Sequence, residues 1–258
     1  MARRIMAGAG CLVLGAALGA ACKLSADYIR QAPAFTIKEV NVNTGQHVSR
    51  EDVLKLAGIR EGRNIFSFHL AEAIQGVEFH PWVKSVSVRR QLPDRVLIEL
   101  EERTPIAIVA MDSLYYLDED LEIFKKVVPA DSLDFPVITG LFLQEVIENK
   151  VTAELRKTAE ILYLAGRSRI LPVKDISEIH LDSIFGIELW TSKDAVLIKF
   201  GEGELQKKWK ELERVVLELD SDLKKVAVLD LNCEGRITAK LKSGYQLARE
   251  EGSMFLRP

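Results

Sequence analysis

The stretch from Gly62 to Ala107 constrains the fold of this chain more than any other, because a helical period, two strand periods and a proline turn follow one another in it. The hydroxyl of Ser67 suits the capping position of a helix. Three apolar residues at helical spacing predict the buried face of that helix: Leu70, Ile74 and Val77. Residues 84–90 and 96–100 then alternate between apolar and polar side chains on either side of Pro93-Asp94. A helix followed by an antiparallel hairpin is predicted.

Upstream of this stretch the pattern predicts one more strand and one more helix. Residues 35–43 alternate as a strand. Ser49 followed by Asp52 resembles a capping box and begins a short helix that ends before Gly58. Gly76 is expected near the end of the next helix, where a residue that tolerates positive φ is wanted. The predicted order of elements is therefore strand, helix, helix, strand, strand.

This order of elements resembles a POTRA domain. Two further features narrow the resemblance, namely the turn Pro93-Asp94 and the strand end Glu102-Arg103-Thr104-Pro105, which occur once and close behind a single apolar segment. Together they resemble the FtsQ/DivIB family of bacterial division proteins. Residues 116–120 and 229–231 are similar to a turn and a strand of that family's larger C-terminal β domain. Asn232-Cys233 stands where the family often has Arg-Tyr, so a partner contact made by that tyrosine is not implied here.

The N-terminal residues predict a membrane anchor. Arg3 and Arg4 precede Ile5 to Cys22, a segment without charge that approaches the about 20 apolar residues needed by a spanning helix. Arginines on this side predict a cytoplasmic N-terminus, with the rest of the chain outside. The alternatives are a cleaved signal peptide and a lipoprotein signal, since Leu18 to Cys22 is similar to a lipobox whose leucine is one place too far from the cysteine.

Small residues recur along this apolar segment at four-residue intervals: Ala7, Cys11, Gly15 and Gly19. Small residues at that spacing let two helices approach closely in lipid. We expect this face to meet the transmembrane helix of a partner. The alternative is that a segment rich in alanine and glycine produces the spacing by chance.

The composition is that of an ordinary globular protein with room for two modest domains. From Ile106 onward short strand patterns predominate, with helical patterns on residues 155–166 and 205–219. The predicted fold class is α+β, with an N-terminal single transmembrane helix, a small POTRA domain, and a larger, mostly antiparallel β domain that carries two packed helices. The predicted divisions are a cytoplasmic tip at 1–4, a transmembrane helix at 5–24, a juxtamembrane connector at 25–34, the POTRA domain at 35–104, the FtsQ-type β domain at 105–243 and a loosely held tail at 244–258.

Charge and cysteines exclude some classes of function. A formal charge of −3 gives no case for nucleic-acid binding. Cys11 and Cys22 lie in the apolar segment and Cys233 stands alone in the body, so neither a disulfide framework nor a zinc spacing is predicted. The histidines are scattered without metal-ligand spacing, and His80 is expected as a loop or packing residue: His47, His69, His80 and His180. No cofactor and no metal is predicted.

Two acidic clusters invite a catalytic or metal-binding interpretation. Asp118 to Glu122 could hold calcium, but the cluster lacks the glycine and spacing of an EF-hand, and a solvated hairpin turn is expected. Glu101 and Glu102 could form a carboxylate dyad, but neighbours in a strand point to opposite faces, and a charged strand end is expected. No catalytic residue is predicted, and an envelope enzyme with an unrecognised site stays as an alternative.

The last predicted strand, residues 236–242, is expected at an edge of the second sheet. Its alternation places Ile237, Ala239 and Leu241 toward the core and leaves four residues outward: Arg236, Thr238, Lys240 and Lys242. An edge strand presents unpaired backbone groups that a partner strand can complete. In the family that this chain resembles, the region receives a short strand from FtsB, and FtsL joins through the same complex. The basic side chains suit an acidic partner segment and serve equally well as protection of the edge against aggregation.

The resemblance implies a non-enzymatic divisome scaffold in the bacterial inner membrane, with its bulk in the periplasm and its place at the division septum. FtsB-type and FtsL-type proteins are the implied partners, and the POTRA domain is a surface for further division proteins. The alternative is a POTRA-containing component of outer-membrane assembly or secretion, of the BamA type. Residues 105–243, with two amphipathic helices, do not resemble the C-terminal part of such proteins.

Overall fold

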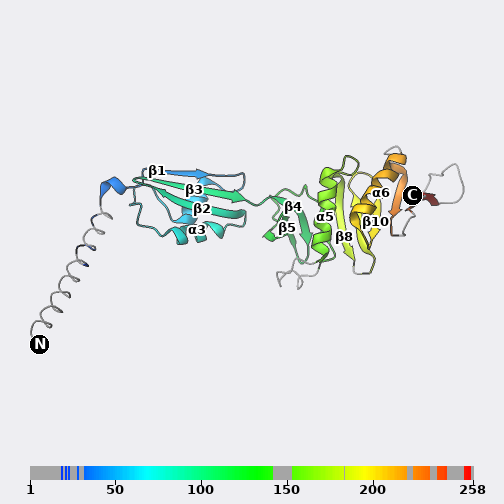
Figure 1. The fold of residues 1–258 in the computed structure, drawn as a ribbon, viewed down its shortest axis with the longest axis horizontal. Helices are drawn as coiled ribbons and strands as arrows, with labels where there is room; N and C mark the ends of the chain where they lie inside the picture. Colours follow the sequence, from blue (N-terminus) through cyan, green and yellow to red (C-terminus); the bar gives the residue numbers. More distant parts are fainter. Residues whose placement is uncertain are drawn as a thin grey trace, which may run out of the picture. The chain divides into compact units, whose positions relative to one another are not determined.

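The computed structural model describes residues 19, 21, 23, 28, 32–141, 153–182, 184–219, 223–232, 237–242 and 253–256. The chain divides into two units, Met1–Arg103 and Thr104–Pro258 (Figure 1). Among the helices of the described residues, none is both long and apolar enough to cross a membrane. Of the small residues expected to pack in a membrane, Ala7, Cys11 and Gly15 lie outside the described residues, and Gly19 is helical and exposed.

The first unit confirms the predicted order of strand, helix, helix, strand, strand. Its sheet has the order β1-β3-β2, in which the central β3 runs parallel to β1 and antiparallel to β2. Three predicted core residues of β3 are buried: Val96, Ile98 and Leu100. The elements are η1 (Pro33–Phe35), β1 (Glu39–Asn43), α2 (Arg50–Ala57), α3 (Leu70–Glu78), β2 (Val83–Gln91) and β3 (Arg95–Glu102).

The start of α2 is as predicted and the start of α3 is not. Ser49 caps α2, since its hydroxyl oxygen accepts a hydrogen bond from the N–H of Asp52 at 3.1 Å. The capping position of α3 is His69, whose side chain makes no capping hydrogen bond. The prediction for Ser67 was wrong because the N–H of Ser67 donates to the carbonyl of Asn64 at 2.9 Å and closes a turn two residues before the helix.

Gly76 has a different role from the one predicted. It lies inside α3, without a positive φ, and the helix continues to Glu78. A Cβ atom at this position would stand 2.2 Å from the carbonyl oxygen of Leu56 in α2. The glycine is needed because the backbones of the two helices approach closely there, and not because a helix ends.

The second unit is a ten-stranded sheet with two long helices. The strand order is β13-β12-β11-β10-β9-β8-β7-β4-β5-β6. Helices α5 and α6 contribute to one core together with the strands, and the buried residues of α6 include Leu205, Trp209 and Leu212, as their spacing predicted. The strands are β4 (Pro105–Ala110), β5 (Leu114–Asp118), β6 (Ile123–Lys126), β7 (Val137–Thr139), β8 (Ile176–Asp182), β9 (Gly186–Thr191), β10 (Leu197–Gly201), β11 (Val226–Asp230), β12 (Ile237–Leu241) and β13 (Ser253–Leu256). The helices are α5 (Ala153–Arg167), η2 (Val173–Asp175), α6 (Leu205–Glu218) and η3 (Leu223–Lys225).

The sheet is mixed and, as expected, mostly antiparallel, since six of the nine pairs of neighbouring strands among the described residues are antiparallel. The three parallel pairs were not predicted. Strands β7 and β8 are parallel, as are β10 and β11, and β4 is parallel to β7. The physical reason is that α5 connects β7 to β8 and α6 connects β10 to β11, so each helix is the crossover that parallel neighbours require. Both crossovers enclose the same core, which places α5 and α6 side by side, joined by a hydrogen bond from Ser168 Oγ to Glu213 Oε1 at 2.7 Å (Figure 1).

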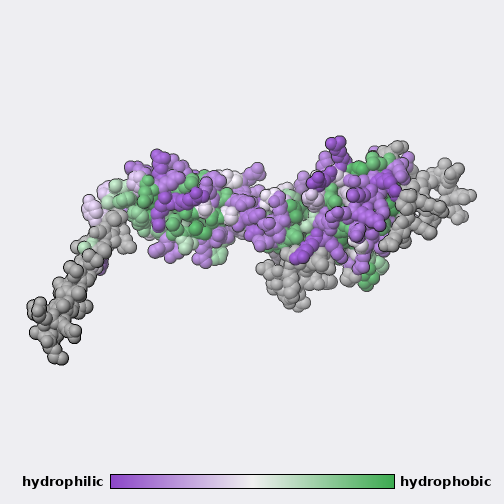
Figure 2. All heavy atoms as spheres, in the orientation of Figure 1, coloured by the Kyte–Doolittle hydropathy of each residue, from purple (hydrophilic) through white to green (hydrophobic). Residues whose placement is uncertain are grey.

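Apolar side chains also reach the surface. In Figure 2 they lie among polar ones at the end of the first unit where residue 32 is found. Leu92, in the turn between β2 and β3, is 59% exposed at that end. Phe79, which follows α3, is 77% exposed where β2 begins.

Candidate functional site

Strand β12 forms from Ile237 to Leu241 and has the alternation that the sequence predicted. Ile237 and Ala239 are buried, Thr238 and Leu241 are half-buried, and Lys240 is exposed. On its inner side β12 runs antiparallel to β11, with Ala239 opposite Leu229. Arg236, which was expected to begin the strand, lies outside the described residues.

The outer side of β12 is not open, which corrects the prediction that residues 236–242 form an edge strand. Residues Ser253–Leu256 form β13, which runs antiparallel to β12 with Ala239 opposite Met254 and Ile237 opposite Leu256. The expectation of a loosely held tail at 244–258 missed this strand because four residues give no clear period. The signal in the sequence is the apolar run from Met254 to Leu256 within an otherwise charged end.

Each backbone N–H of β12 faces one of the two neighbouring strands, β11 or β13. The N–H of Lys242 donates to the carbonyl of Lys225 at 2.9 Å, on the β11 side. Because amide groups along a strand alternate between its two sides, the N–H groups of Lys240 and Thr238 also face β11. Those of Ile237 and Ala239 face β13. The candidate docking groups are therefore the amides of the two buried residues.

The basic side chains of this region have different surroundings. Lys240 is exposed. Lys242 is half-buried, and its Nζ donates to the carbonyl of Asp194 at 2.6 Å. Its ammonium group is therefore held at the turn between β9 and β10. Of the predicted basic set, Lys240 is therefore the one that the described residues leave at the surface.

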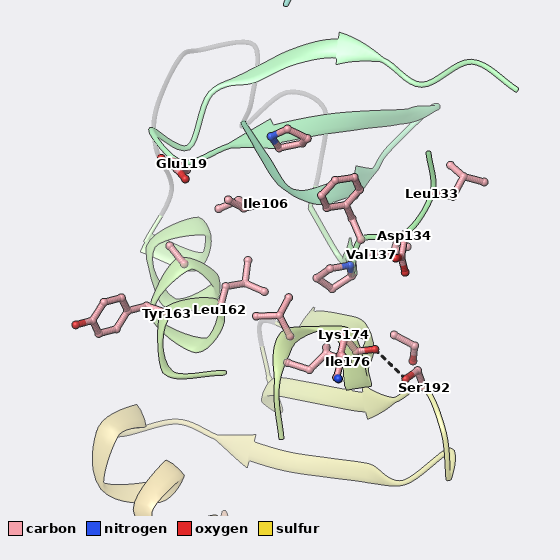
Figure 3. Close-up of a pocket in the computed structure, with 16 residues that line it drawn as sticks. Ile106, Glu119, Leu133, Asp134, Val137, Leu162, Tyr163, Lys174, Ile176 and Ser192 are labelled. Atoms are coloured by element: carbon pink, nitrogen blue, oxygen red, sulfur yellow. Dashed lines mark hydrogen bonds between the residues drawn. The ribbon is translucent and has the colours of Figure 1, made fainter. Parts of the chain in front are cut away.

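A cavity of about 980 Å³ lies between α5 and the beginnings of β4, β7 and β8 (Figure 3). Its wall includes Leu162 of α5, Ile106 of β4 and Ile176 of β8, with Tyr163 62% exposed at the rim. The hydroxyl of Ser192 donates to the carbonyl of Lys174 at 3.2 Å. This apolar hollow was not predicted, because its wall comes from residues that are distant in the sequence.

Glu102, expected as part of a charged strand end, organises a loop of the first unit. Its carboxylate accepts hydrogen bonds from three successive backbone N–H groups, of Gln46 at 3.0 Å, His47 at 3.0 Å and Val48 at 2.9 Å. Partial burial by itself would raise the pKa of Glu102, but these hydrogen bonds and that of the His47 side chain lower it. His47 in turn stacks on Trp82 with ring centroids 3.6 Å apart. The arrangement is a structural clasp and not a carboxylate dyad.

The acidic turn is a hairpin turn, but it is not simply solvated. Asp118 is buried, and its Oδ1 accepts hydrogen bonds from the N–H of Asp120 at 3.0 Å and of Glu122 at 2.9 Å. The carboxylate therefore shapes the turn. Within the described residues no group of three or more His, Cys, Asp or Glu side chains could hold a metal ion.

Thr139, Glu178 and His180 meet on neighbouring strands, a grouping that the sequence did not indicate. The hydroxyl of Thr139 donates to Glu178 Oε1 at 2.7 Å and lies 2.7 Å from His180 Nδ1. Since the hydroxyl has one proton, Nδ1 of His180 is the donor in the second hydrogen bond. The histidine does not act as a base toward this hydroxyl. The chain of hydrogen bonds joins β7 to β8.

The comparisons with known proteins cover both units. Residues 35–103 match the family described as POTRA domain, FtsQ-type, and residues 107–248 match the family described as Cell division protein FtsQ/DivIB, C-terminal. The chain belongs to the FtsQ/DivIB family. A cell division protein FtsQ from Syntrophotalea carbinolica is 33% identical over 94% of this chain and 88% of its own length. FtsQ proteins from Geotalea daltonii and Anaeromyxobacter are 30% and 33% identical, over 80% and 84% of this chain and 76% and 74% of their own lengths.

Asn232, two residues after the end of β11, makes structural contacts. Its N–H donates to Asp230 Oδ1 at 2.9 Å. Gly201, with a φ of +60°, leaves room for its side chain, since a Cβ on Gly201 would stand 2.0 Å from Asn232 Oδ1. Asn232 therefore fixes the end of β11 against the end of β10, next to the connection that leads to β12.

Proposed function

We propose that this chain is a non-enzymatic scaffold of the bacterial divisome, anchored in the inner membrane by residues 5–24 with its bulk in the periplasm at the division septum. Membership of the FtsQ/DivIB family supports the setting. The pairing of β12 supports the mode of binding, because its outer amides already accept a strand from the same chain. This pairing is the observation that carries the proposal.

The partner is an FtsB-type protein that contributes an extended strand, with an FtsL-type protein joining through the same complex. The incoming strand takes the place of β13 and runs antiparallel to β12, as β13 does. Ile237 and Ala239 are buried, so the positions opposite them suit apolar residues of the partner. Lys240 at the surface suits an acidic residue beside the docked strand.

Replacement of β13 is physically reasonable because β13 is short and has one neighbour. It contains four residues, and among the described strands it pairs with β12 alone. Short edge segments of this kind open with much lower free energy than the centre of a sheet. A partner strand that pairs with all of β12 and adds contacts of its own displaces it.

The experiment is depletion of the protein in its host followed by complementation. Depleted cells should grow as filaments without septa. The wild-type chain and Ala239→Gly, which keeps the amide N–H, should restore division, whereas Ala239→Pro, which removes an outer donor, should not. Membrane-fraction immunoblots and thermal unfolding would verify that Ala239→Pro accumulates and folds. Cells that divide normally after depletion, or after replacement by Ala239→Pro, would contradict the proposal.

A further inference from the structure

Three segments of the first unit meet at the end where residue 32 lies, which we call the leading end. They are η1, residues 62–68 and the turn at residues 91–94. The N–H of Ile65 donates to the carbonyl of Phe35 at 2.8 Å, and the N–H of Lys38 donates to that of Asp94 at 2.8 Å. Arg90 Nε donates to the carbonyl of Ile65 at 2.8 Å. These contacts fix the three segments as one surface.

The leading end combines apolar and basic side chains. Leu92 is 59% exposed, Pro33 and Pro93 are exposed, and the rings of Phe35 and Phe66, both half-buried, lie 5.4 Å apart. Among the residues of these segments and those flanking them, five are basic and three are acidic: Lys38, Arg60, Arg63, Arg90 and Arg95 against Glu39, Glu61 and Asp94. Lys38 pairs with Asp94, Arg95 pairs with Glu39, and Arg50 pairs with Glu61. The leading end therefore carries a net positive charge.

The opposite end of the same unit serves as an internal reference. Phe79 is 77% exposed there, just before β2 begins. The nine residues of β2 separate it from Leu92. At about 3.3 Å per residue, the strand holds the two ends about 30 Å apart. An exposed large apolar residue and an exposed proline, Pro81, are thus found at the opposite end too, and the basic cluster is what distinguishes the leading end.

The chain outside the described range indicates what lies opposite the leading end. Residues 5–22 are free of charge, and residues 23–32 connect them to η1. Ten residues reach at most about 36 Å when fully extended. The leading end is consequently held near the surface of whatever membrane residues 5–22 enter. Basic residues interspersed with apolar ones match a surface of anionic headgroups above an apolar layer.

We propose that the leading end of the POTRA unit binds the anionic phospholipid surface of the membrane, with Arg63 and Lys38 at the headgroups and Leu92 at the boundary of the acyl layer. This inference rests on the membrane anchor of the proposed function. Such binding would hold the first unit against the bilayer surface.

The test uses the full chain in lipid nanodiscs with and without phosphatidylglycerol, after replacement of its cysteines by serine. A fluorophore is attached at Gln91→Cys on the leading end, or at Glu78→Cys on the opposite end as the matched control. Doxyl-labelled lipids should quench the first label several-fold more than the second, and only when phosphatidylglycerol is present. Arg63→Glu combined with Leu92→Asp should abolish this quenching, whereas Phe79→Asp should leave it unchanged.

The outcomes separate the lipid contact from the anchor. Equal quenching at the two positions, or quenching that does not respond to the paired substitution, would overturn the lipid contact. Shielding of the Gln91→Cys label from a water-soluble quencher without quenching by lipid would overturn it too, since protein would then cover this end. Extraction of the chain from membranes by alkaline carbonate would instead contradict the proposed anchor.

Discussion

Glu102 at the end of β3 accepts a hydrogen bond from the backbone N–H of Val48 at 2.9 Å, although 54 positions separate them in the sequence. The same carboxylate holds the N–H groups of Gln46 and His47, so it fixes the loop between β1 and α2. It does so from the last residues of the first unit, because Arg103 ends that unit. Glu102 thus joins the end of β3, the last strand of the POTRA unit, to the loop between β1 and α2.

Glu102 makes the stability of the first unit depend on pH. Hydrogen bonds from the loop lower its pKa below the ordinary value of 4.5, in spite of its partial burial. A carboxylate with a lowered folded-state pKa contributes stability above its unfolded pKa, and the contribution is lost as the pH falls through the folded value. Glu102→Gln should cost about 1–3 kcal/mol at neutral pH and flatten the dependence below pH of about 5.

Urea unfolding of the full chain between acidic and neutral pH, followed by tryptophan fluorescence, measures this effect. Glu101→Gln is the control, since Glu101 is exposed and receives one hydrogen bond, from Ser85. A loss of stability that is equal for the two variants would show that the clasp at Glu102 is not special.

Two helical glycines should respond to alanine in opposite directions. Gly76→Ala places a Cβ 2.2 Å from the carbonyl oxygen of Leu56, so the helices must separate, at about 1–3 kcal/mol. Gly166 in α5 has nothing within 4 Å of the added atom, so Gly166→Ala should stabilise its unit by roughly 0.5–1 kcal/mol. Thermal unfolding of the two variants measures both signs. Stabilisation by Gly76→Ala would disprove the close approach of α2 and α3.

Arg90 should not be replaceable by lysine. Its guanidinium donates to the carbonyls of Ile65 and Phe68 and lies 4.7 Å from the ring centroid of Phe68. A lysine has no planar fork for both carbonyls, so Arg90→Lys should cost about 1–3 kcal/mol. The neighbouring Arg89 is exposed and pairs with Glu99, so Arg89→Lys should change stability by less than about 0.5 kcal/mol. Chemical denaturation of both variants tests the difference, and equal values would contradict it.

The sequence predicted local structure well where one period or one cap decides it. The capping of α2 by Ser49 and the apolar face of α6 needed only residues a few positions apart. It also predicted a mostly antiparallel second sheet, but not which neighbouring strands of that sheet are parallel. The two helical patterns between strands could have indicated parallel pairs, since such pairs need a crossover and α5 and α6 are those crossovers.

The candidate site shows a second limit. The alternation of the sequence predicted that Ile237 and Ala239 are buried. It did not predict β13 as the outer neighbour of β12, because strand pairing between distant residues leaves no periodic pattern in the sequence. Glu102 was missed for a related reason. Its partners are backbone N–H groups of a distant loop, and backbone groups leave no trace in the sequence.

In the proposed function, a partner strand docks on β12 in place of β13. The backbone N–H of Ala239 faces β13, and Ala239 stands opposite Met254. In a hydrogen-bonded antiparallel pair the two residues exchange backbone hydrogen bonds, so the N–H of Met254 donates to Ala239. Met254→Pro removes that N–H donor and should release β13 from β12. Met254→Ala keeps the N–H donor and should leave β13 in place. When β13 occupies the site for most of the time, the apparent affinity for a partner strand equals the intrinsic affinity multiplied by the fraction of molecules whose edge is open.

The most direct measurement is the affinity of the full chain for the purified FtsB-type protein of the same bacterium, compared among the wild type, Met254→Pro and Met254→Ala. We predict that Met254→Pro binds at least about tenfold more tightly than the other two, as expected if its own strand leaves the edge open less than about a tenth of the time. Equal affinities for the three chains, or weaker binding by Met254→Pro, would contradict the account.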